Sequence, residues 1–237
     1  MLKLTISDQN LELLPDYHQR IEVLKQMHYI DEQGTVQLKG RVACEINSAD
    51  ELLLTELVLD NVFADYEPAE VVAILSAFVF QERNASEPRL TPKLMKAKET
   101  VLTYARKVAQ VQVDCGLPIS VEDYVNGLHF GLVEAVYEWA RGLPFKHITD
   151  LTDVLEGSIV RCISRLDETT REVMSAARMV GDTNLYKKME QAEQDIKRDI
   201  VFAASLVSSI FILLFYIILL ILIIYYLFIL VLLIPFT

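Results

Sequence analysis

The sequence lacks the short motifs by which enzymes hold nucleotides, metals and nucleophiles. None of its eight glycines is followed by lysine, which excludes a P-loop, because that loop needs a Gly-Lys step to cradle phosphates. Gly-x-Gly-x-x-Gly, His-Glu-x-x-His and Cys-x-x-Cys are also absent. The histidines lie on separate segments, at His18, His28, His129 and His147. We therefore expect no catalytic site, no metal site and no cofactor in this chain.

Cysteine and positive charge are also scarce. The three cysteines, Cys44, Cys115 and Cys162, lie too far apart to suggest a disulfide framework, which favours a reducing compartment. The N-terminus has no hydrophobic stretch typical of a secretory signal. With 22 basic and 33 acidic residues the net charge is −11, which argues against a free-standing nucleic-acid binder that works by bulk electrostatics.

Charge is missing altogether after Asp199. Residues 207–236 contain no charged side chain and one proline, Pro235, near their end. A run of about 20 apolar residues is enough to cross a bilayer. The pattern predicts a C-terminal transmembrane helix, with the membrane as a partner and residues 1–206 in the cytosol. The alternative is that the run is translated intron or downstream sequence, and both interpretations stay open.

The remaining sequence has the periodicity of helices with short connections. Prolines at Pro15, Pro68 and Pro92 suit first helical positions, and Gly116 and Gly181 suit helix ends. Ser48 and Glu51 form a capping-box signature, and residues 35–46 alternate like an extended element. We predict an all-α bundle of about seven helices, over residues 15–28, 52–61, 68–79, 92–115, 120–140 with a break near 127, 153–180 and 183–200.

Two of these helices carry unusual charge patterns. Residues 89–107 hold six basic side chains and one acid, which a solvated helix face explains. On the helix around residue 165, an apolar stripe lies opposite a ladder of two arginines and two acids, Arg161, Arg165, Glu168 and Glu172. The ladder fits i,i+3 and i,i+4 salt bridges on an exposed surface, and composition alone favours that interpretation. It also fits a face directed at a polyanion with exposed bases.

Several segments resemble a known family. The runs TVQLKGRVACEI (35–46), DELLLTELVL (50–59) and FVFQE (78–82) resemble the DSHCT region, the C-terminal domain of Ski2-like exosome helicases. So do residues 136–168 and IKRDIVFAASL (196–206), and the resemblance covers nearly all of residues 10–206 in the family's order. Residues 111–120 and the AARMVGD run resemble the cytoplasmic superkiller helicase more than its nuclear relative.

The resemblance implies a role in RNA decay. Members of the family are superfamily-2 DExH RNA helicases that feed RNA to the exosome for 3′-to-5′ decay. In these helicases, two RecA-like domains bind ATP and Mg²⁺, and the helical bundle helps to close a ring around single-stranded RNA. The implied partners are therefore RNA, a RecA-like core, Ski complex subunits and the exosome, and the implied location is the cytoplasm.

Individual residues acquire expected roles from the same resemblance. The helix over 153–180 is similar to the family's ratchet helix, which lies across the RNA path. On it, Arg165 and Glu168 align with the Arg and Glu that face RNA bases, and Arg161 is a further RNA-binding candidate. Residues 1–46 then correspond to a return segment from the arch, residues 47–206 to the DSHCT bundle, and residues 207–237 to an added tail.

Two functions from different classes follow. The first is a non-catalytic RNA-channel domain of an exosome-linked helicase, present here as a fragment without the RecA core. The second is a tail-anchored membrane interaction module, or a truncated paralogue with a protein-docking role. Neither would be an enzyme by itself, because the Walker A and DExH motifs are absent.

Overall fold

The computed structural model describes residues 14–198, and in them every regular element is helical. This confirms the predicted all-α class. The elements are α2 (Leu14–Gln26), α3 (Leu38–Ala43), α4 (Glu51–Leu59), α5 (Pro68–Val79), α6 (Pro92–Asp114), α7 (Val121–Asn126), the 3₁₀ turn η2 (Phe130–Leu132), α8 (Val133–Ala140), α9 (Phe145–Ile148), α10 (Glu156–Val180) and α11 (Thr183–Ile196). They exceed the seven expected, because several segments divide into shorter helices.

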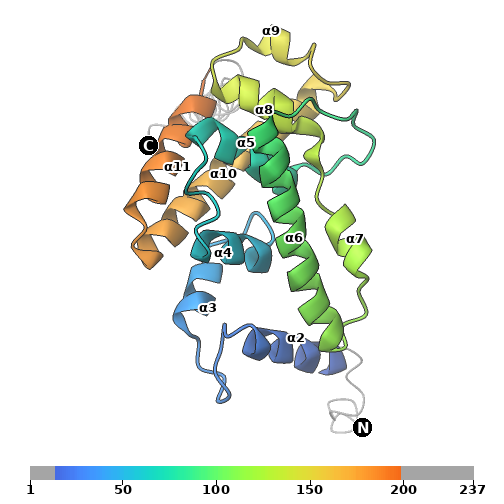
Figure 1. The fold of residues 1–237 in the computed structure, drawn as a ribbon, viewed down its shortest axis with the longest axis vertical. Coiled ribbons are helices and arrows are strands. Elements are labelled where there is room, and N and C mark those ends of the chain that lie inside the picture. Colours follow the sequence, from blue (N-terminus) through green and yellow to red (C-terminus); the bar gives the residue numbers. More distant parts are fainter. Residues whose placement is uncertain (1–13, 199–237) are drawn as a thin grey trace, which may run out of the picture. The chain divides into compact units, whose positions relative to one another are not determined.

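Helix α5 lies at the centre of the core. Its sequence is apolar on nearly all sides, and a helix of that kind is stable only when neighbours surround it. Helices α8, α10 and α11 all pack against it (Figure 1). Helices α10 and α11 form a closely packed pair that is joined at Gly181, whose φ of 85° is the left-handed conformation that favours glycine. The central position of α5 fixes the direction in which α10 presents its remaining surface.

The prediction of an extended element over residues 35–46 is wrong. Among the described residues, the only β-type pairing is an isolated bridge between Ile30 and Val36, and α3 follows directly. Gly40 explains the result, because any side chain there would clash with the Tyr29 carbonyl oxygen. The glycine lets this short helix pack tightly against the preceding turn and bury Val42 completely. Tertiary packing therefore overrides the alternating local pattern.

The predicted capping box at Ser48 and Glu51 is also wrong. The residue that caps α4 is Asp50, whose carboxylate accepts a hydrogen bond from the Leu53 amide at 2.8 Å. Other predicted boundaries agree well with the structure. Thr91 and Ser120 cap α6 and α7, and the expected break near residue 127 separates α7 from α8.

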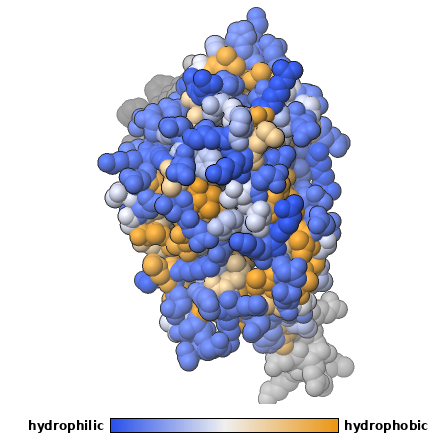
Figure 2. All heavy atoms as spheres, viewed as in Figure 1, coloured by the Kyte–Doolittle hydropathy of each residue, from blue (hydrophilic) through white to orange (hydrophobic). Residues whose placement is uncertain are grey.

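The tail predicted as a transmembrane helix, residues 207–236, lies outside the described residues. Within residues 14–198, no helix is both long enough and apolar enough to cross a membrane. The boundary expected at 206/207 also lies outside them, and the boundary at 46/47 stays a prediction. The face in Figure 2 is mainly hydrophilic, with apolar side chains in small separated groups. Such a distribution is ordinary for a protein surface in water.

Candidate nucleic-acid interface

Helix α10 has the two faces that its sequence predicts. The whole expected stripe is inaccessible to solvent, with exposed fractions of 0% for Ile159, Ile163, Leu166, Thr170, Val173 and Ala177. These side chains pack against α4, α5 and α11. Because that side of α10 is fixed in the core, residues on the opposite side must face away from it.

The three predicted site residues lie on this opposite side. Arg161 and Glu168 are exposed, and Arg165 is partly exposed. Within residues 14–198, none of the three forms an ion pair or a side-chain hydrogen bond. The ion pair that does form within α10 joins Arg171 to Asp167 at 2.7 Å. The salt bridges that the ladder could have formed are thus absent for Arg161, Arg165 and Glu168, and the charges of these three residues remain available to a ligand.

Glu172, the fourth member of the predicted ladder, has a different role. Its carboxylate accepts hydrogen bonds from the amide of Ser48 at 3.0 Å and from the Ser48 hydroxyl at 2.6 Å. The same hydroxyl lies 2.6 Å from the Thr169 hydroxyl. Glu172 therefore fastens α10 to the segment before α4, and only three residues of the ladder form the free polar face.

A hollow of about 160 Å³ lies beside the two arginines. The last residue of α5 and the three that follow it form one wall, and Ser158, Arg161, Cys162 and Arg165 form the other. Phe80 ends α5 with an extended backbone, which places Gln81 and Glu82 at the surface. The hollow thus combines two guanidinium groups with an amide and a carboxylate. These are groups that pair with phosphates, stack on bases or bond to base edges.

Nothing in this hollow resembles a catalytic centre. Its one thiol is Cys162, and burial raises the pKa of that thiol to about 12, so it stays protonated at neutral pH. The described residues also contain no group of three or more His, Cys, Asp or Glu side chains that could hold a metal ion. The arrangement is suited to binding.

Comparison with known proteins identifies the family of this helical bundle. Residues 33–203 match the DSHCT (NUC185) domain. The chain belongs to this family. The match includes all of α3 to α11, and therefore both walls of the hollow.

Similar proteins carry this DSHCT bundle within much longer chains. The chain is 52% identical over 206 residues to the DExH-box ATP-dependent RNA helicase DExH11 of Arabidopsis thaliana, which covers 86% of this chain and 15% of that protein. It is 50% identical to superkiller complex protein 2 of Homo sapiens, over 86% of this chain and 16% of that one. Its identity to the human exosome RNA helicase MTR4 is 43%, over 79% and 18%. The higher identity to the superkiller protein agrees with the resemblance expected from the sequence.

Gln81 and Glu82 line the hollow beside α10, and neither is among the residues that the sequence predicts for this face. Both belong to the FVFQE run that carries the family resemblance, but the sequence gives no reason to place them beside α10. The available signal was two consecutive polar residues directly after a buried helix. Only the packing of α5 against α10 brings them to the same hollow as Arg161 and Arg165.

Proposed function

We propose that this DSHCT bundle binds single-stranded RNA along the exposed face of α10. The observation that carries the proposal is the state of Arg161, Arg165 and Glu168. All three lie opposite the packed stripe, and none is paired with another described residue. Guanidinium groups stack on bases and bind phosphates, and a carboxylate accepts hydrogen bonds from base amino groups.

The role of the bundle would be that of a non-catalytic RNA-channel domain. Two of its relatives, DExH11 and MTR4, are named as RNA helicases, and the chain spans about 15% of the length of the first and 18% of the second. A RecA-like core would supply ATP and Mg²⁺ binding and the motor activity. By the same resemblance, the bundle would work in the cytoplasm with Ski complex subunits and the exosome, on RNA that is degraded from its 3′ end.

The affinity of the chain alone for RNA is expected to be low. Its net charge is −11, so that long-range electrostatics oppose the approach of a polyanion. One helix face also supplies only a few contacts, whereas a closed ring would supply many. We expect a dissociation constant weaker than submicromolar at physiological salt.

Photocrosslinking detects contacts of this strength and locates them. Single-stranded RNA containing 4-thiouridine is irradiated with the full-length protein, and the crosslinked peptides are identified by mass spectrometry. Crosslinks to the α10 peptide and to the Gln81–Glu82 segment are expected. The single variants Arg165→Ala and Glu168→Ala should each reduce them several-fold.

Arg178→Ala is the matched control. Arg178 is an exposed arginine on the same helix that stacks on Tyr186 at 5.1 Å, and it points to a different side from Arg165. Equal losses from the Arg178 and Arg165 variants would indicate bulk electrostatics and refute the assigned face. Crosslinks confined to other helices would refute it as well.

A further inference from the structure

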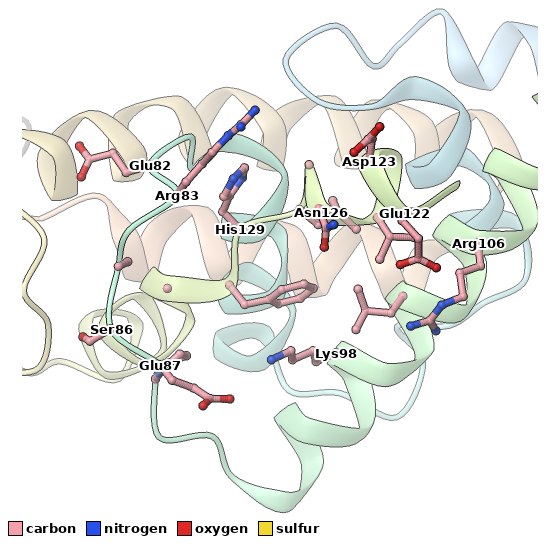
Figure 3. A pocket seen from close by; sticks show the side chains of 18 residues that line it. Glu82, Arg83, Ser86, Glu87, Lys98, Arg106, Glu122, Asp123, Asn126 and His129 are labelled. Carbon is pink, nitrogen blue, oxygen red and sulfur yellow. The ribbon is translucent and has the colours of Figure 1, made fainter. Parts of the chain in front are cut away.

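A second and larger hollow lies between α6, α7 and the loop that follows α5. Its volume is about 810 Å³ (Figure 3). Three cationic side chains line it, Arg83 from the loop and Lys98 and Arg106 from α6. Lys98, Leu102 and Arg106 are spaced four residues apart, so all three lie along one side of α6. Part of the basic run of residues 89–107 is therefore directed into a hollow and is not simply solvated.

The loop over residues 81–91 is held in place at several points. The Ser86 amide donates a hydrogen bond to Asp153 Oδ1 at 2.8 Å, and the Arg89 amide donates one to Glu134 Oε2 at 2.6 Å. Directly before Ser86, Ala85 packs on Gly131, where any Cβ would clash with the Ala85 side chain. The hollow is thus preformed, and a ligand would not have to order the loop on binding.

The three cations share the hollow with acidic residues but form no direct ion pair with them. Within residues 14–198, Arg83, Lys98 and Arg106 form no ion pair. Lys98 instead lies over the Phe130 ring, with its ammonium 5.2 Å from the ring centroid. By contrast, Lys93 in the same basic run is paired with Glu70 at 3.0 Å.

Acidic residues also line the hollow, so it is not a general cation patch. Four acids line it in all, namely Glu82, Glu87, Glu122 and Asp123. In Figure 3, Glu82 points away from the interior at one end, and Asp123 points away at the opposite rim. Uncharged hydrogen-bonding groups lie between them. Asn126 offers an amide, and His129 has two ring nitrogens that find no hydrogen-bond partner. Separate cations beside unsatisfied polar groups suit a ligand that has both phosphates and bases.

The two hollows are neighbours at the surface, because Glu82 lines both of them. We propose that the α6–α7 hollow is a second binding site for single-stranded RNA, reached by the strand that contacts α10. Arg83, Lys98 and Arg106 would bind phosphates, and Asn126 and His129 would face a base or a ribose. This inference rests on the proposed function, since it extends the RNA path beyond Arg165.

The test compares two double variants of the same helix. Lys98→Gln with Arg106→Gln removes two positive charges that line the hollow, and Lys96→Gln with Lys107→Gln removes two that lie on the other side of α6. Both variants change the net charge equally, so bulk electrostatics affect them alike. Binding of the full-length protein, kept in detergent, to fluorescent single-stranded RNAs of about four and about twelve nucleotides is measured by anisotropy over a range of salt concentrations.

If the hollow binds RNA, the Lys98/Arg106 variant weakens binding of the longer RNA roughly tenfold and lowers the salt slope by about 1.4, the value for two lost phosphate contacts. The Lys96/Lys107 variant should stay within about twofold of the wild type. Binding of the shorter RNA should depend on Arg165 and much less on Lys98 and Arg106. Unchanged melting temperatures establish that both variants are folded.

Equal effects of the two double variants would overturn the inference. A lack of RNA crosslinks to the residues that line the hollow would overturn it as well. If Arg165→Ala weakens binding and the Lys98/Arg106 variant does not, the second site is refuted and the α10 proposal stands. If only the Lys98/Arg106 variant weakens binding, the hollow is an RNA site and the α10 proposal fails.

Discussion

Adjacent residues of α10 should respond to truncation in opposite ways. Leu166 is 0% exposed and packs in the core, whereas Arg165 lies on the free face without an ion pair to any described residue. Leu166→Ala removes about three methylene-sized groups, at about 0.8 kcal/mol each for the lost transfer free energy. Because the surrounding helices cannot close the cavity fully, the total loss in the free energy of unfolding should be about 2–5 kcal/mol. Arg165→Ala leaves no cavity and should cost at most about 0.5 kcal/mol.

The measurement is urea unfolding of the full-length protein, followed by circular dichroism, for the wild type and the two variants. RNA crosslinking of the same samples should give the reverse order, with a large loss for Arg165→Ala and a small one for Leu166→Ala. Loss of a stacked or base-edge contact is worth about 1–3 kcal/mol of RNA interaction. If Arg165→Ala lowers the unfolding free energy as much as Leu166→Ala, then Arg165 is a structural residue and the assignment of the two faces is refuted.

Three further predictions concern the loop beside the second hollow and the buried thiol. Gly131→Ala should lower the free energy of unfolding by about 1–3 kcal/mol, because its Cβ overlaps Ala85, whereas Gly157→Ala in α10 meets no atom within 4 Å and should be neutral or stabilising in urea titrations. Equal effects of the two glycine substitutions would contradict the close packing of the loop over residues 81–91 on Gly131. Thiol labelling should modify the exposed Cys44 rapidly and leave Cys162 protected until unfolding, and rapid labelling of both would contradict its burial. Because the pKa of Cys162 is raised from 9.0 to about 12 in the fold, its unfolded thiol loses a proton first, so stability should fall as the pH rises from 9 toward 12, and this decline should be shallower in Cys162→Ala.

Much of the fold could be predicted because its signals are local. A proline at a first helical position, a hydroxyl that caps a helix and a glycine at a helix end act within one turn of the chain. Pro92 and Thr91 correctly mark the start of α6, and Gly181 marks the end of α10. The prediction for residues 35–46 failed because the deciding signal there is not local. The helix depends on the contact between Gly40 and the Tyr29 backbone, which the local pattern does not contain.

The sequence by itself determined the two faces of α10, because helical periodicity places apolar and charged residues on opposite sides in any context. It also determined the family, through runs that extend across most of the chain. Only the tertiary structure decided which charges on that face are free. Glu172 is held by Ser48, a partner 124 positions away, while Arg161 and Arg165 border a hollow whose other wall follows α5. Contacts between distant segments form only when packing brings those segments together, and a single sequence carries no spacing rule that specifies them.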